Sequence, residues 1–271
     1  MQIENYNKPG HFYLLATLLP WGFWSLAAYI SHLPAGYENQ ASIIAFFGLL
    51  SPILVVFGIT YKNKSMLNDM KSRLLFSKSI KIKYFIISCC LMLFSILLAQ
   101  SISLLFNYSP MQFKLAEQFS FSSGVFPVWF LLIIAPLLEE LIWHSYGTDC
   151  LRNRFNLFYT SALFALYWGI WHIPLSFINN YYHSNLVEEG LIYSINFIVS
   201  LFPFVIIMNW LYYKANRSIL ITIIFHITAG LFNEIFQTHP MSKVIQTALL
   251  LALSIYLLTT EKDFFFKRTI R

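Results

Sequence analysis

The sequence predicts an all-α, polytopic integral membrane protein, and two observations carry that prediction. Hydrophobic residues make up 58% of the 271 positions and charged residues only 11%, a composition that the polar surface of a soluble domain cannot cover. The apolar residues also fall into stretches of about 20, the length that a helix needs to cross a hydrocarbon core of about 30 Å. We therefore expect a single membrane domain over residues 1–271.

Eight apolar segments are long enough to cross the membrane as helices. The first is longer than the apolar part of a signal peptide, and its leader contains Glu4 and a single Lys8, so we expect it to remain as a helix. In the fifth, Pro174 disturbs the helix just beyond His172, because proline removes a backbone donor and crowds the preceding turn. In order, the segments cover residues 11–31, 41–60, 84–106, 125–146, 157–178, 190–212, 218–237 and 244–260.

The basic residues predict the orientation, because cytoplasmic loops retain Lys and Arg. With the N-terminus inside, all but two of the 18 basic residues lie on the inner side, and only Lys114 and Lys243 lie outside. We therefore expect both termini in the cytoplasm, at a bacterial plasma membrane. The net charge of +6 follows from this rule and from contact with anionic membrane lipid, so no nucleic-acid partner is expected. The inner basic residues are Lys8, Lys62, Lys64, Lys71, Arg73, Lys78, Lys81, Lys83, Arg152, Arg154, Lys214, Arg217, Lys262, Lys267, Arg268 and Arg271.

The connection between Lys62 and Lys83 is the long polar loop of the inner face. Met66, Met70 and Leu74 recur within it at helical spacing. Two interpretations fit this pattern, an amphipathic helix lying in the membrane interface and a solvated basic loop.

Ionisable side chains within the apolar segments need a function, because a charge at the bilayer centre costs about 3 kcal/mol on insertion scales. The stretch LLEELIWH carries Glu139, Glu140 and His144, while His172 and His226 lie in the fifth and seventh segments. Residues four apart share a helix face, so Glu140 and His144 stack and Glu139 points about 100° away. Two carboxylates this close cannot both ionise cheaply unless a cation or metal is near. The pattern is that of a buried hydrolytic site with a general base.

The expected depths of these residues disagree with one another. Counted from the inner helix ends, Glu140 and His226 lie about 13 Å deep, and His172 about 20 Å if its helix begins at Leu157. We therefore expect that helix to begin later, with residues 150–160 along the inner interface.

Three stretches resemble the motifs of the CAAX protease and bacteriocin-processing family of intramembrane peptidases, which are multi-helix membrane proteins. The family pattern reads EExxxR, then an aromatic residue separated by three residues from a histidine, then HxxxN. Here the stretches are EELIWH, WGIWHIPL and ILITIIFHITAGLFN, in the same order. The resemblance covers residues 125–237 and implies a catalytic core formed by the fourth, fifth and seventh helices.

The resemblance also implies a role for each matching residue. Glu139 would activate the attacking water, helped by His172, and Trp168 would be the aromatic residue of the second motif. Glu140 would be oriented by the residue in the arginine position. His226 would stabilise the oxyanion of the tetrahedral intermediate, which is the chemistry that peptide hydrolysis needs besides a base.

Two positions depart from the family pattern. His144 replaces the arginine, and it pairs with Glu140 only as a protonated ring or as a neutral donor. Gly230 replaces the asparagine, and Asn233 lies seven residues after His226, about 10 Å further along the helix on nearly the same face. An active, diverged peptidase and an inactive descendant both fit these residues.

We interpret the chain as an intramembrane endopeptidase that acts on a membrane-associated protein or peptide, such as a prenylated CAAX protein. A zinc hydrolase is the mechanistic alternative, with Glu139 or Glu140, His172 and His226 as ligands and a fourth position for water, although no HExxH spacing is present. A non-catalytic scaffold or bacteriocin-immunity protein would tolerate the two departures. A transporter would use the same residues as a proton relay, but it would favour paired broken helices.

Overall fold

The structure, a computed structural model, describes residues 3–34, 36–75, 80–122 and 124–268. Within these residues the chain forms helices and one isolated antiparallel bridge, between Leu115 and Phe236. The expected all-α class is confirmed, and the long apolar helices make the chain an integral membrane protein. Lys78 and Arg271, two of the basic residues assigned to the inner side, lie outside the described residues.

Each of the eight expected segments coincides with a helix, but among the described residues only six pass as full-length spans. α7 (Leu157–Trp171) continues as a 3₁₀ turn and then bends by 85° into α8 (Tyr182–Glu189), so this segment is a broken span or a re-entrant loop. α10 (Ile219–Glu234) has 16 residues, fewer than a full crossing needs. The number eight therefore stays a prediction. The six spans are α1 (Pro9–Ser31), α2 (Glu38–Thr60), α4 with its 3₁₀ end (Ile82–Phe106), α5 (Val128–Ile142) continued by α6 (Thr148–Arg152), α9 (Leu191–Lys214) and α11 (Pro240–Thr260).

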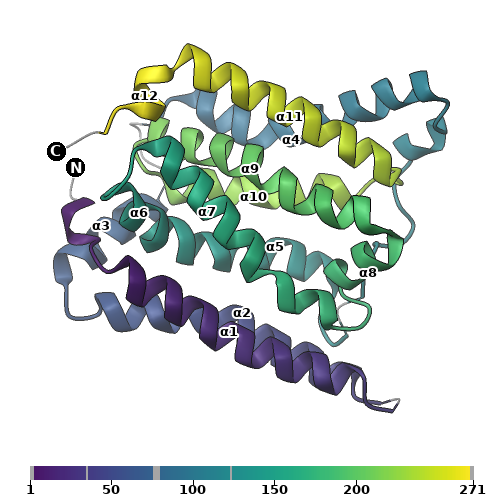
Figure 1. Ribbon diagram of the computed structural model, residues 1–271, viewed down its shortest axis with the longest axis horizontal. Coiled ribbons are helices and arrows are strands. Elements are labelled where there is room, and N and C mark those ends of the chain that lie inside the picture. The colour runs from purple at the N-terminus through teal and green to yellow at the C-terminus, as the bar shows by residue number, and fades with distance from the viewer. Residues whose placement is uncertain (1–2, 35, 76–79, 123, 269–271) are drawn as a thin grey trace.

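The helices lie roughly parallel (Figure 1). The helices that carry the Glu and His residues singled out above lie in the middle. α1 packs along α2 at one edge and α4 along α11 at the other, while α5, α7, α9 and α10 fill the space between them. Both termini lie at one end of the bundle, and α8 and the loop before α5 lie at the other. Shorter elements are α3 (Lys64–Leu74), α12 (Lys262–Phe266) and the 3₁₀ turns Ile3–Asn5, Pro110–Phe113 and Ile173–Phe177.

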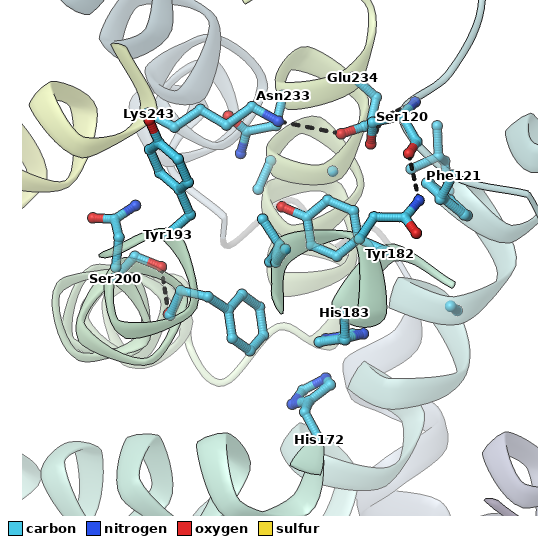
Figure 2. Close-up of a pocket in the computed structure, with 18 of the residues that line it drawn as sticks. Ser120, Phe121, His172, Tyr182, His183, Tyr193, Ser200, Asn233, Glu234 and Lys243 are labelled. Atoms are coloured by element: carbon cyan, nitrogen blue, oxygen red, sulfur yellow. Dashed lines mark hydrogen bonds and ion pairs between the residues drawn. The ribbon is translucent and has the colours of Figure 1, made fainter. Parts of the chain in front are cut away.

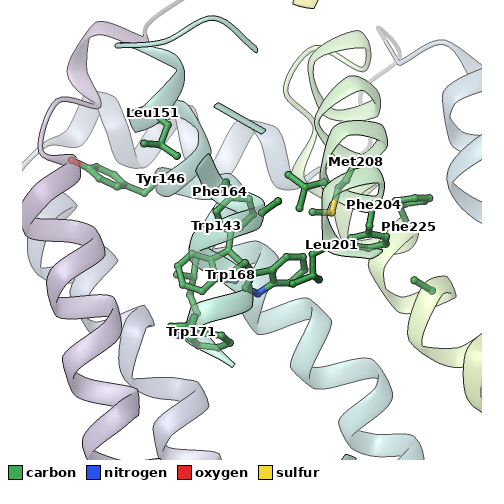
Figure 3. Close-up of a cluster of buried hydrophobic side chains, with 14 of the residues drawn as sticks. Trp143, Tyr146, Leu151, Phe164, Trp168, Trp171, Leu201, Phe204, Met208 and Phe225 are labelled. Carbon is green, nitrogen blue, oxygen red and sulfur yellow. The ribbon is translucent and has the colours of Figure 1, made fainter. Parts of the chain in front are cut away.

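Buried aromatic side chains form the core between α5, α7 and α9 (Figure 3). Trp143 meets Trp171 at 5.2 Å between ring centroids, and Phe164 stacks on Trp168 at 5.5 Å. All four side chains are at most 2% exposed. Because a buried indole needs a partner for its N–H, this core supplies fixed donors where α5 passes α7.

α3 shows that the polar connection after α2 is helical at its start. The Asn63 side chain caps it by accepting a hydrogen bond from the Met66 backbone N–H at 3.1 Å. Met66 is buried, whereas Lys64 is exposed. The segment is therefore helical over Lys64–Leu74, and its position in the membrane interface stays a prediction.

A cluster of charged side chains ties α3 to α6 and to the turn after α9. Arg73 contacts Asp69 at 3.0 Å and Asp149 at 3.2 Å, and Arg217 contacts the same two carboxylates. Burial raises the pKa of the Asp69 carboxyl, but Arg73, the Tyr6 hydroxyl and Arg217 outweigh it, so the pKa lies below its usual value. Two arginines thus share two carboxylates away from solvent.

One turn between α5 and α6, Trp143–Gly147, is a π-helix. Arg73 donates to the carbonyl oxygens of His144 and Ser145, both at 2.9 Å, and the Tyr212 hydroxyl donates to the His144 oxygen at 2.9 Å. Such turns leave carbonyls outside the regular helical pattern and recur at functional sites. The ionic cluster thereby holds the turn that carries His144.

α7 begins at Leu157, so the expected later start, with residues 150–160 along the interface, is wrong. The Asn156 side chain caps the helix by accepting from the Tyr159 N–H at 2.9 Å. The difference in depth shrinks for another reason. The helix that carries Glu140 runs on to Arg152. Glu140 therefore lies about 18 Å from that helix end, and His172 lies about 22 Å from Leu157, where α7 begins.

Candidate active site

Glu139 points from α5 toward α7 and is held by two indoles. Its Oε2 accepts from Trp168 Nε1 at 2.8 Å and from Trp143 Nε1 at 3.4 Å. The residue is 7% exposed. The two donors fix the carboxylate without a cation, which keeps it available as a base.

Glu140 faces the other way and lies between two histidines. Its Oε1 is 2.9 Å from His226 Nδ1 on α10, and its Oε2 contacts His144 Nδ1. His144 Nε2 lies 3.0 Å from Asn209 Oδ1, while the Asn209 amide donates to Ser161 Oγ at 2.9 Å. Both ring nitrogens of His144 thus face acceptors, which suits the doubly protonated ring. In that form His144 is a cation beside Glu140, at the arginine position of the motif.

His172 ends α7 and faces the same space as Glu139. Its Nδ1 lies 2.7 Å from the Trp168 carbonyl oxygen, so Nδ1 is the donor and Nε2 the acceptor of a neutral ring. The ring stacks on His183 of α8, with centroids 5.0 Å apart and planes 25° apart. The 3₁₀ turn containing Pro174 follows directly.

A cavity of about 610 Å³ brings the three motifs together. Glu139, Trp168, His172, His226 and Asn233 all line it. Glu140 and His144 do not line it, and both are 0% exposed. The cavity extends to a rim formed by residues of the loop before α5, α8, and the facing ends of α10 and α11, at the end of the bundle opposite both termini (Figures 1 and 2). The rim residues in Figure 2 include Ser120, Phe121, Tyr182, Glu234 and Lys243.

Comparison with known proteins matches this arrangement to one family. Residues 121–232 match the family described as type II CAAX prenyl endopeptidase Rce1-like. Over 269 residues the chain is 33% identical to CAAX prenyl protease 2 of Methanococcus maripaludis, covering 98% of this chain and 99% of that relative. The chain belongs to the Rce1-like family. Membership supports intramembrane endopeptidase activity for this Rce1-like protein, and the comparisons show no bacteriocin-immunity role.

The side chains around the cavity of this Rce1-like protein give little support to the zinc hypothesis. Within the described residues, no three His, Cys, Asp or Glu side chains gather in a way that could hold a metal ion. Glu139 Oε2 already accepts hydrogen bonds from two indole N–H groups, and His226 Nδ1 is engaged with Glu140. We therefore derive no catalytic step through a metal.

The space beside Gly230 is open toward the cavity. A Cβ atom added there would meet only Leu132 Cδ2, at 3.6 Å, which is an ordinary van der Waals distance. Asn233 lines the same wall, and its Oδ1 is buried without a hydrogen-bond partner among the described residues. The Rce1-like chain thus lacks the motif asparagine but leaves room for a Cβ atom at its position.

Several site residues were not found from the sequence. Trp143 is the second donor to Glu139, Asn209 and Ser161 support His144, and His183 covers His172. Asn209 could have been found from the sequence. A polar amide within an apolar span needs a hydrogen-bond partner, just as a charged group does. His183 had no such signal, because α8 approaches His172 only through the 85° bend that follows α7.

Proposed function

We propose that this Rce1-like chain is an intramembrane endopeptidase that hydrolyses a peptide bond of a prenylated, membrane-associated protein. The observation that carries the proposal is Glu139, held by two indole donors in the wall of a cavity that His172 and His226 also line. Family membership supports the reaction class, and the words prenyl and CAAX in the names of the family and of its archaeal member suggest the substrate class.

The proposed chemistry uses four side chains. Glu139 takes a proton from a water molecule that the acceptor nitrogen of His172 orients, and the water oxygen attacks the scissile carbonyl carbon. When the His226 ring carries both protons, Nδ1 donates to Glu140 and Nε2 donates to the oxyanion. Glu139 then returns its proton to the leaving amine, so the carboxylate is restored as the C–N bond breaks.

The proposal is tested with the purified protein in lipid nanodiscs. The substrate is a quenched fluorescent peptide with an S-farnesylcysteine followed by three residues and a free carboxyl end, the arrangement that the term CAAX denotes. We expect cleavage, at least about tenfold faster than that of the unfarnesylated peptide, because a buried isoprenoid adds apolar contact. Folded protein that cleaves neither peptide would contradict the proposal and favour the non-catalytic scaffold.

Restoring the motif asparagine should increase activity. In Gly230→Asn the added Cβ meets Leu132 at an ordinary distance, and the amide, one helical turn after His226, would add a donor for the oxyanion. Removing one such donor from established enzymes costs about 10²–10³ in kcat, so we expect a gain of roughly tenfold or more in kcat on the farnesylated peptide. Gly230→Leu has a similar volume but no donor, and it should show no gain. An equal response of the two variants would contradict a missing donor at this position.

A further inference from the structure

The rim of the cavity carries a cation that the catalytic proposal does not use. Lys243, on the first turn of α11, is the sole Lys or Arg among the described residues that line the cavity. Its side chain is 21% exposed, and its Nζ lies 3.4 Å from Glu234 Oε1 and 5.9 Å from the centroid of the Tyr182 ring. Figure 2 shows this pair across the cavity from His172.

The contact with Glu234 leaves donors of the Lys243 ammonium unoccupied among the described residues. Its other oxygen, Oε2, accepts from the Ser120 backbone N–H at 3.0 Å and from the Ser120 hydroxyl at 2.7 Å. The 3.4 Å contact with Lys243 is long compared with the roughly 2.8 Å of a close charge-assisted hydrogen bond. An ammonium has three donors, and the structure gives this one a single hydrogen-bond partner among the described residues. Glu117 and Glu189 also line the cavity, but both are exposed, where solvent and salt screen their repulsion.

The spacing along α10 between His226 and Glu234, the partner of Lys243, is close to the length of a short peptide. Glu234 follows His226 by eight residues on α10, which is about 12 Å along the helix axis. Three residues of extended chain span about 10–11 Å. Between the two ends lies Asn233, whose buried Oδ1 has no partner among the described residues and lines the cavity. A peptide lying along α10 would offer it a backbone N–H.

We propose that the Lys243 ammonium binds the C-terminal carboxylate of the substrate, with the scissile bond three residues from that end. The subsite rests on the proposed function, because it places the cut at Glu139 and His226. The enzyme would then be specific for peptides with a free C-terminal carboxylate. Internal loops with the same side chains would be poor substrates.

The test compares farnesylated peptides that carry two, three or four residues after the cysteine, each as the free acid and as the C-terminal amide. For the wild type we expect kcat/KM on the three-residue acid to exceed that on its amide by about tenfold or more, mainly through KM, since a hydrogen bond to a charged group contributes about that much. Lys243→Met should bring the acid-to-amide ratio close to one, and Lys243→Arg should keep it high. Each of three results would overturn the subsite. These are equal rates on the acid and the amide, an acid-to-amide ratio that is preserved in Lys243→Met, and a preference for a peptide with two or four residues after the cysteine.

A binding measurement separates this subsite from the catalytic proposal. A fluorescent tripeptide with a free carboxyl end should bind the wild type about tenfold more tightly than its amide does, and Lys243→Met should lose that difference at an unchanged melting temperature. Acid-selective binding without any hydrolysis would retain the subsite and overturn the proposed peptidase. Equal binding of acid and amide would overturn the subsite, whatever the rate of hydrolysis.

Discussion

Glu139→Gln should lower kcat on the farnesylated peptide by about 10³-fold or more. The amide oxygen can still accept from the Trp168 and Trp143 indoles, so the side chain stays in place, but it cannot take a proton from water. A general base contributes about 10²–10⁴ to the rate, and here the same group also delivers the proton to the leaving amine. KM should change little.

The matched control is Glu188→Gln, which neutralises an exposed glutamate of α8 that does not line the cavity. Its kcat should equal that of the wild type. The melting temperature of Glu139→Gln should be at least as high as that of the wild type, because the variant removes a buried charge. Full activity of Glu139→Gln would show that another group activates the water and would remove the basis of the mechanism.

Asp149→Asn should destabilise the fold by about 3–5 kcal/mol, the cost of leaving buried charges without their partner. Asp149 is 0% exposed, contacts both Arg73 and Arg217, and accepts from the hydroxyls of Tyr212 and Tyr213. The asparagine has nearly the same shape, so the loss isolates the charge. Thermal unfolding in detergent measures it as a lower melting temperature.

Asp263→Asn provides the comparison for this second variant. Its partner Lys267 lies one helical turn away, and both side chains are largely exposed, at 76% and 72%. Surface pairs of this kind contribute little to stability, so the melting temperature should not change. If Asp149→Asn melted at the wild-type temperature as well, the cluster around Arg73 would not hold the π-helical turn.

The sequence was sufficient for the fold class and for part of the cavity wall, namely Glu139, His172 and His226, because both leave local signals. Apolar runs mark helices, and ionisable groups such as Glu139 and His172 stand out within them. The departures from the motif were visible in the same way, as His144 and Gly230. The proposed roles of these residues still await the experiments above.

Other features leave no local signal. Arg73 and Arg217 contributed to the topology prediction as two of many basic residues, and nothing in their neighbours distinguishes them from exposed ones. Their burial depends on Asp69 of α3 and Asp149 of α6, which are far from each other in sequence and meet only in the folded chain, where both arginines contact both carboxylates. The π-helical turn has the same origin, because the carbonyls it frees are satisfied by Arg73 from another helix.

The cavity rim lies at the end of the bundle opposite both termini, and apart from Lys114 and Lys243 the charge rule assigns the basic residues to the side of the termini. The orientation of the enzyme therefore decides from which side the substrate reaches the rim. With the basic end in the cytoplasm, as the charge rule predicts, chain ends reach Lys243 from the outer leaflet. A tail anchored in the cytoplasmic leaflet would then lie a full membrane thickness, about 30 Å, from the rim. Labelling a cysteine placed at Ser120 from one side of sealed vesicles therefore identifies the leaflet that delivers the substrate, as well as the direction in which the chain is inserted.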